Sequence, residues 1–202
     1  MKTEILKVKG DWEEVVNDCR VTVGKEELGH EPSTDFKTSI LIAEHSPIRD
    51  ISFKWRWSGI KSWIATHWVR HKWECFVKSQ RSDRTGVRRD SLPQDAPVDF
   101  VGEANVQHLI DTMRKRLCFQ AAKETRDYAY DLKKSINEVD EEIAEVLVPN
   151  CVYRGACPEM NPCNRWLKFL DWADYEYGCE AGQLTLHERY VLWNEFFYEG
   201  EW

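Results

Sequence analysis

Hydrophobic and polar positions change their period several times along the chain, and each change predicts an element. Alternation with a period of two is clearest where Ile51, Phe53, Trp55 and Trp57 share one face, which indicates a half-buried strand. Segments 4–8 and 73–78 are also predicted strands. Steps of three and four residues predict amphipathic helices over 12–19, 36–44, 60–68, 103–117 and 121–146. Ser33 or Thr34 would cap the second of these helices.

Glycine and proline mark the connections between these segments. Ser58-Gly59 predicts a turn between the strand 51–57 and the helix that follows. Residues 82–102 contain two glycines and two prolines and predict a loop that passes over a surface. Pro149 begins a region of different composition, with cysteines first and then an aromatic, acidic tail. We therefore expect a core over 1–148 and a second segment over 149–202 packed on it.

Composition and charge exclude several classes of protein. The chain of 202 residues is 42% hydrophobic, which suits a folded core, and its net charge of −7 argues against a general nucleic-acid binder. A mean hydropathy of −0.60 without a long uncharged apolar run argues against a membrane span. The N-terminus has no apolar secretory core, so we expect a cytoplasmic protein with reduced thiols.

The charge is distributed unevenly. Residues 49–89 hold eleven Lys or Arg against three acids, so this segment carries +8 inside an acidic chain. Such a segment favours a small anionic ligand bound at a focused site. For any one of these arginines, a solvated surface position is the alternative interpretation.

Two short motifs in the basic segment carry a family resemblance. Arg-His-Lys at 70–72, followed by Ser-Gln-Arg at 79–81, resembles the signature of the flavin-dependent thymidylate synthases. Further matches span residues 3–146: Cys-Arg-Val-Thr at 19–22, His-Ser-Pro at 45–47, Arg89, Leu-Pro at 92–93, Asn-Val-Gln-His-Leu at 105–109 and Arg116. Lys72 and Gln107 replace arginines of the family pattern, and the spacer before Ser79 is one residue short. The resemblance implies an α/β (α+β) fold with a central antiparallel sheet flanked by helices.

The resemblance also implies an activity and a substrate site. The reaction would be reductive methylation of dUMP to dTMP, with methylenetetrahydrofolate as carbon donor and NADPH as reductant. Arg81 and Arg89 would hold the phosphate, and Ser79 and the backbone of Gln80 would complete its cradle. Arg116 would stabilise negative charge on the pyrimidine, so Arg116 and Arg81 are the catalytic candidates. His67 matches a family position near the substrate.

The cofactor implied by the resemblance is FAD, held between subunits of a homotetramer. Its expected ligands are Arg70, His71, Lys72, Thr22, Ser46, Asn105 and Asp111, the last at a position where asparagine is common. The cofactor would carry out the redox chemistry, while the protein positions and polarises it. No nucleic-acid or membrane partner is expected.

A separate cysteine pattern lies beyond the family-like region. Cys151, Cys157 and Cys163 are spaced by five residues, unlike the CxxC of common zinc knuckles. With Cys118 or Cys179 as a fourth ligand they could hold zinc or an iron–sulfur cluster. Buried free cysteine is the alternative, because cysteine packs as a small hydrophobe. The tail, with tryptophans at 166, 172, 193 and 202, is expected to pack on the core or at a subunit interface.

Two alternative functions stay open at the level of sequence. The first is another flavin-dependent one-carbon transfer to a pyrimidine nucleotide, which the departures at Lys72 and Gln107 motivate. The second is a non-catalytic nucleotide or protein binder whose cysteine segment holds a structural metal. Bound flavin would separate an enzyme from a binder.

Overall fold

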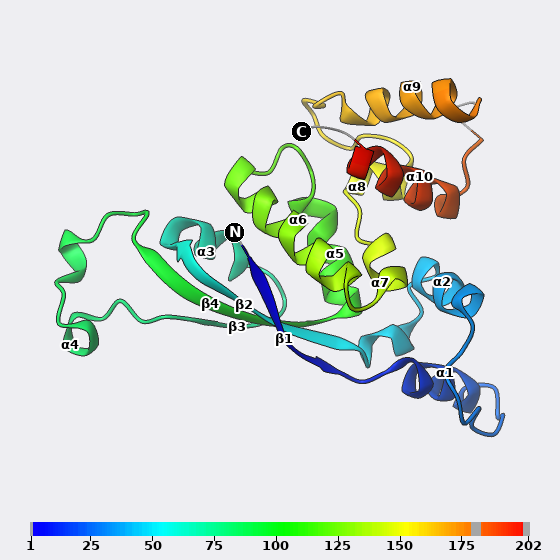
Figure 1. Ribbon diagram of the computed structural model, residues 1–202, viewed down its shortest axis with the longest axis horizontal. Helices are drawn as coiled ribbons and strands as arrows, with labels where there is room; N and C mark the ends of the chain where they lie inside the picture. Colours follow the sequence, from blue (N-terminus) through cyan, green and yellow to red (C-terminus); the bar gives the residue numbers. More distant parts are fainter. Residues whose placement is uncertain (1, 179–182, 200–202) are drawn as a thin grey trace. The chain divides into compact units, whose positions relative to one another are not determined.

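The computed structural model describes residues 2–178 and 183–199. It divides into two compact units: the first contains residues 1–31 and 46–108, and the second contains residues 32–45 and 109–202. Figure 1 labels the elements, and each unit is described by itself. None of the helices in these described ranges has the length and apolarity that a bilayer crossing requires.

A four-stranded antiparallel sheet forms the centre of the first unit, as expected. Its strands are β1 (Thr3–Lys9), β2 (Ser52–Lys61), β3 (Glu74–Val77) and β4 (Pro97–Asn105), in the order β1-β2-β4-β3. The alternation predicted for β2 is confirmed, because Phe53, Trp55 and Trp57 are fully buried. Their burial on one face contributes to the apolar core of this unit.

Strand β2 continues through the turn predicted at Ser58-Gly59. Its register with β4 shifts between Trp57 and Ile60, and Gly59 has a φ of 70°, so the glycine sits in a bulge rather than ending the strand. Helix α3 (Ser62–Trp68) consequently begins later than predicted. Pairing with β4 decides this, because the partner strand pairs with β2 on both sides of the bulge.

The loop predicted over 82–102 is wrong over its last six residues, 97–102. Residues from Pro97 onward form β4. Glu103, predicted to begin a helix, lies inside this strand. Pro97 is tolerated because it stands at the first residue of the strand. Gly102 lies opposite Trp55, and a Cβ built on it would come within 2.4 Å of that indole ring. Pro97 and Gly102, which locally favour a loop, therefore both have structural roles in β4.

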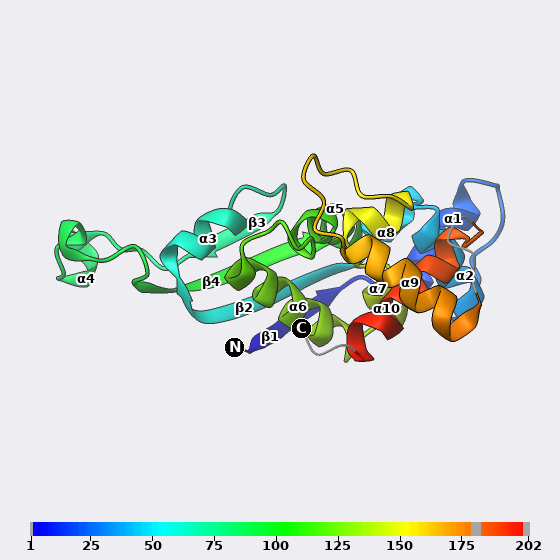
Figure 2. The same cartoon turned by 90° about the horizontal axis from the view of Figure 1, so that it is seen from above.

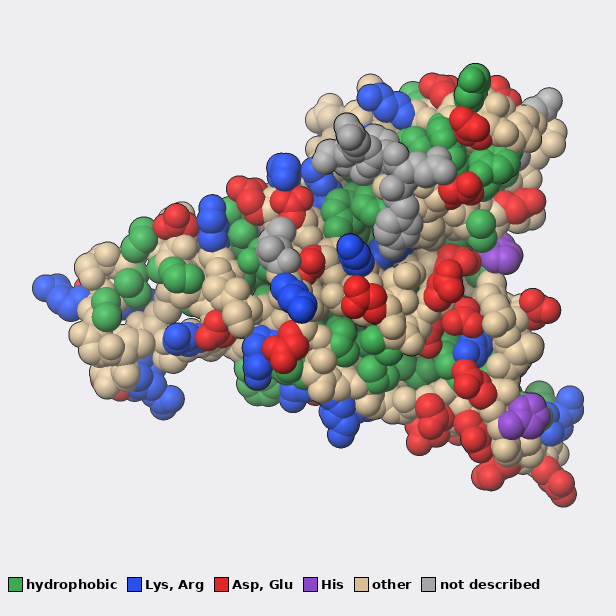
Figure 3. All heavy atoms as spheres, viewed as in Figure 1, with side chains coloured by type: hydrophobic (Ala, Val, Ile, Leu, Met, Phe, Trp, Pro, Cys, Tyr) green, Lys and Arg blue, Asp and Glu red, His purple; other side chains and the backbone are tan. Residues whose placement is uncertain are grey.

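The remaining first-unit elements surround this sheet. Helix α1 (Trp12–Val21) is capped by Asp11, and the short helix η1 (Ser46–Arg49) packs against it. Helix α3 packs on β2 and β4. Residues 78–96, called the arm below, connect β3 to β4 and contain α4 (Ser82–Thr85) and η2 (Arg89–Ser91). Figures 1 and 2 both show α4 beyond the end of the strands, and Figure 3 shows Lys and Arg side chains around it.

The second unit is helical. It contains α2 (Thr34–Ile42), most of α5 (Val106–Arg116), α6 (Lys123–Asn137), α7 (Glu141–Glu145), α8 (Asn150–Arg154), α9 (Arg165–Tyr177) and α10 (Leu186–Glu199). The single helix predicted over 121–146 is two helices. Asp140 caps α7 by accepting a hydrogen bond from the Ile143 amide at 2.9 Å, and Val139 is exposed in the break.

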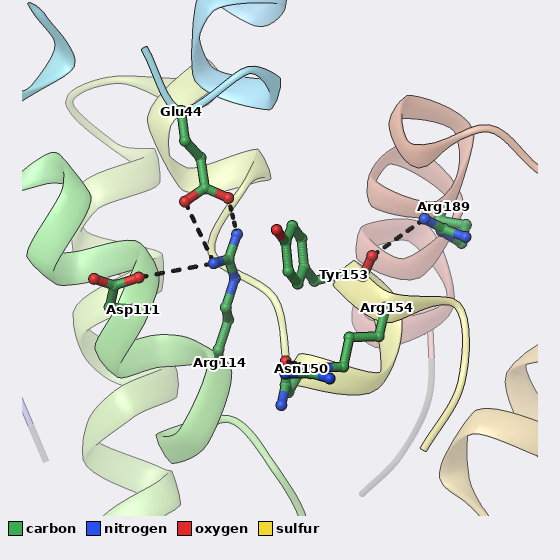
Figure 4. Close-up of polar contacts among 7 residues, drawn as sticks. All are labelled: Glu44, Asp111, Arg114, Asn150, Tyr153, Arg154 and Arg189. Atoms are coloured by element: carbon green, nitrogen blue, oxygen red, sulfur yellow. Dashed lines mark hydrogen bonds and ion pairs between the residues drawn. The ribbon is translucent and has the colours of Figure 1, made fainter. Parts of the chain in front are cut away.

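A partly buried ion pair joins three helical elements of the second unit (Figure 4). Arg114 of α5 donates two hydrogen bonds to the carboxylate of Glu44, which follows α2. Its guanidinium lies 3.5 Å from the ring centroid of Tyr153 in α8, and Asp111 lies 3.7 Å away. The Arg114 side chain is only 12% exposed, so the pairing satisfies a charge that water reaches poorly.

Candidate functional site

The first unit contains a cavity of about 600 Å³ between α3, the residues after β3 and the start of β4. Four residues expected at the substrate site line it together: Ser79, Gln80, Arg81 and Arg89. The volume is in the range of small-molecule sites. The arm positions these residues, because it leaves the sheet after β3 and returns to it at β4.

One wall of this cavity is largely apolar. It is built by Trp63 and Val69 with Val77 and Val98. The backbone fixes this wall, because the amides of Ser62 and Trp63 donate to carbonyls at the end of the arm at 3.1 and 3.2 Å. Such a wall can accept a planar base, while the arm supplies polar groups.

The opposite rim is cationic. Arg81 is held by Asp83 through hydrogen bonds of 3.0 and 2.6 Å, and its amide donates to the Ser79 hydroxyl at 3.3 Å. The Arg89 amide donates to the Ser82 hydroxyl at 3.0 Å. Within the described parts of the chain, the guanidinium of Arg89 has no polar partner. An exposed arginine in this state is available to a phosphate or carboxylate.

Two of the expected substrate residues are not among those that line the cavity. His67 lies on α3, and its ring contacts that of Trp63 edge-to-face, with the ring centroids 5.5 Å apart. Arg116 ends α5 and is half-buried in the second unit. Trp63 and Gln94 also line the cavity, although no sequence motif predicts them there. Helical periodicity had placed Trp63 on the buried face of α3, and nothing local to Gln94 indicated a site.

The expected cofactor motif lies in the turn between α3 and β3. Arg70 and Lys72 are exposed and have no polar partner within the described residues. The His71 ring lies 5.2 Å from that of Trp73 and 6.1 Å from that of Trp68. The motif thus presents two available cations beside an aromatic cluster.

The other expected cofactor residues have local roles. The Thr22 hydroxyl donates to the Cys19 carbonyl at 2.7 Å at the end of α1, and Asn105 accepts from the His108 amide at 2.9 Å at the start of α5. Ser46 begins η1 and is exposed. Asp111 contacts Arg114 in the second unit. Any contact of these residues with FAD stays a prediction.

The cysteines of the expected metal site converge in the second unit. Cys151, Cys157 and Cys163 line one cavity with Cys118. Burial raises the pKa of the Cys151 thiol to about 12. In the ranges that the structure describes, no three His, Cys, Asp or Glu side chains stand in a ready metal-binding arrangement. Cys179, the other expected fourth ligand, and Trp202 lie outside the described residues.

Neither a family model nor a curated protein matches this chain. Several solved structures, in contrast, match its fold. Flavin-dependent thymidylate synthase ThyX from Helicobacter pylori, complexed with FAD and dUMP, aligns with a TM-score of 0.61 at 12% identity over 73% of this chain and 100% of that one. A second ThyX structure from H. pylori gives 0.60 at 13% over 73% and 99%.

The UMP/dUMP methylase PolB from Streptomyces cacaoi, bound with 5-Br dUMP, aligns with a TM-score of 0.57 at 13% identity over 72% of this chain and 93% of that one. Identities this low compare folds and leave substrates open. The family resemblance found in the sequence is confirmed at that level, and the chain has the fold of the flavin-dependent thymidylate synthases over about three quarters of its length.

Proposed function

We propose that this chain catalyses the FAD-dependent reductive methylation of dUMP, with methylenetetrahydrofolate and NADPH as co-substrates. One observation carries the proposal: Ser79, Gln80, Arg81 and Arg89 line one cavity of suitable size. Solved proteins with the same fold hold FAD and dUMP or a dUMP analogue.

The cavity suits a nucleoside monophosphate because it joins an apolar wall to a cationic rim. Trp63 and the valines can pack against a pyrimidine, while Arg89, Arg81 and the Ser79 hydroxyl can hold a dianionic phosphate. Guanidinium groups suit this task because they bind bidentately and stay charged. Binding by Arg81 requires it to share or leave its pair with Asp83.

Arg116 is proposed as the group that stabilises negative charge on the pyrimidine ring. Methylation at C5 needs electron density at that carbon, and a fixed cation near a ring carbonyl favours the charge that develops. Arg116 is half-buried at the end of α5 and does not line the cavity, so the family resemblance of its position carries this assignment.

The residues of the cofactor motif fit a dinucleotide such as FAD. Arg70 and Lys72 are exposed cations that could pair with its pyrophosphate, and the aromatic cluster beside His71 could border its ring system. FAD, when bound, supplies the redox chemistry. The chain binds it, orients it and excludes water, with Thr22, Ser46, Asn105 and Asp111 as further proposed contacts. We also propose a homotetramer in which different subunits contribute to one cofactor site.

A second candidate is one-carbon transfer to another pyrimidine nucleotide, with UMP as the first to test. The specific observation is the likeness to a methylase whose substrates are named as UMP and dUMP. The departures at Lys72 and Gln107 also favour an altered reaction. A ribose 2′-hydroxyl is the only difference between the two substrates on the sugar.

The full chain, purified and mixed with FAD, tests both candidates. Flavin absorbance retained after gel filtration reports cofactor binding, and mass spectrometry of the nucleotide reports methylation of dUMP or UMP. Arg89→Ala should weaken nucleotide binding, whereas Arg84→Ala should not, because Arg84 lies in the same arm but outside the cavity lining. A chain that bound neither flavin nor pyrimidine nucleotide would leave only a non-catalytic protein-binding role.

A further inference from the structure

The connection between α8 and α9 is irregular and almost entirely polar or exposed. Residues 155–164 form no helix or strand, and Met160 at their centre is 97% exposed. Cys157 and Cys163 are partly buried, although most of their neighbours in this loop are exposed. A loop that buries so little apolar surface needs another stabilising interaction to offset the conformational entropy that it loses when it is ordered.

The two loop cysteines meet two more cysteines at one enclosed cavity. Cys118 lies two residues after α5, and Cys151 lies in the first turn of α8. All four line the same cavity, whose volume is about 10 Å³. A cavity of this size holds roughly one water-sized sphere, so the side chains around it enclose little open space.

Charged groups of both signs lie at the cavity, because Arg165 and Glu159 both line it. Arg126 of α6 and Arg165 of α9 lie on the ring of Phe119 at 4.1 and 4.2 Å, and Arg165 lines the cavity. A divalent metal bound by four thiolates has a net charge of about −2, which nearby guanidinium groups offset. The Gln120 side chain donates to the Asn161 carbonyl, so the loop is tied to the segment that carries Cys118.

We propose that Cys118, Cys151, Cys157 and Cys163 bind one structural Zn²⁺ that anchors the loop to the helices of the second unit. Four thiolates on a tetrahedron are a preferred zinc environment, with Zn–S distances of about 2.3 Å. No three donors among the described residues already stand in that arrangement, so metal binding requires the four thiols to come together as they release their protons. This site is independent of the proposed catalytic function.

Metal analysis of the full chain, purified under reducing conditions, tests the site. We expect about one zinc per chain, lost in Cys157→Ser and Cys163→Ser. Cys75→Ser and Cys19→Ser are the matched controls, because neither cysteine is among the residues that line this cavity, and both variants should keep the metal. A chelator should lower the melting temperature of the parent protein and of Cys75→Ser, because binding energy at such a site is folding energy.

A second measurement covers variants that fail to fold. The parent chain loaded with Co²⁺ should show the intense visible and near-ultraviolet bands of a tetrahedral thiolate site. Metal-free protein in which all seven cysteines titrate as free thiols would overturn the proposal. A disulfide between any two of the four, or the absorbance of an iron–sulfur cluster, would overturn it as well.

Discussion

Arg81 and Asp83 form a two-point ion pair at the rim of the candidate substrate cavity. Arg81 Nε donates to one Asp83 carboxylate oxygen at 3.0 Å, and Nη2 donates to the other at 2.6 Å. The carboxylate therefore occupies the guanidinium edge that a phosphate would use. Both side chains are about 60% exposed, so water screens the pair. Replacing the Asp83 carboxylate by a phosphate therefore requires little free energy.

Removing this carboxylate should strengthen phosphate binding. We expect Asp83→Asn to tighten the affinity for dUMP several-fold, because an exposed pair contributes only about 0–1 kcal/mol and a like charge near the phosphate disappears. Calorimetric titration measures the change, and Asp90→Asn, an exposed aspartate of the same arm, is the control. Weaker binding by Asp83→Asn would instead assign Asp83 to orienting Arg81.

The two arginines with different proposed roles should separate kinetically. Arg89→Ala should raise KM for dUMP with kcat nearly unchanged, because a phosphate ligand binds ground state and transition state alike. Arg116→Ala should lower kcat by about 10²–10³-fold, as the loss of a group acting on developing charge does. Steady-state kinetics and single-turnover flavin oxidation measure both. Retained turnover in Arg116→Ala would remove its catalytic assignment.

A buried lysine should make the stability of the chain depend on pH. Lys133 donates to the Leu147 carbonyl and to Asn194, and burial lowers its pKa to about 7 although the charge of Glu145 raises it. The unfolded chain keeps a pKa near 10.4, so it binds more protons than the folded chain between about pH 7 and 10. Stability should therefore rise with pH across this window.

Urea unfolding of Lys133→Met at several pH values measures this contribution. The parent protein should gain up to about 1.4 kcal/mol per pH unit relative to the variant in the window above pH 7. Lys134→Met, which changes the exposed neighbouring lysine, should retain the parent's slope. Parallel pH profiles for the parent and Lys133→Met would show that the lysine is charged in the folded state.

Removing the charge of Glu44 while Arg114 keeps its own should lower the free energy of unfolding. Glu44→Gln removes the nearer carboxylate from a guanidinium of 12% exposure, and we expect a loss of about 1–3 kcal/mol in the free energy of unfolding. Asp111→Asn should cost much less, because Asp111 is 59% exposed and its oxygen lies 3.7 Å from Arg114. Denaturant unfolding compares the two, and equal losses would contradict a dominant role for Glu44.

Sequence alone was sufficient where the signal is local. Alternation at 51–57 predicted β2, and the Ser33 cap and helical period predicted α2, because side-chain period and capping depend on near neighbours. The motif at 79–81 and Arg89 identified four lining residues, since they are close in sequence and the arm brings them together. The resemblance carried by these motifs also gave the fold.

Only the tertiary structure decided the features that depend on distant partners. Pro97 and Gly102 signal a loop by local preference, yet pairing with β2 makes them a strand, because interstrand hydrogen bonds outweigh weak propensities. Cys118 joins cysteines more than thirty positions away only through the packing of the helices. The Arg114–Glu44 pair likewise joins residues 70 positions apart. The sequence pattern predicts which face of an element is apolar. Which other element packs against that face depends on the packing of the whole chain.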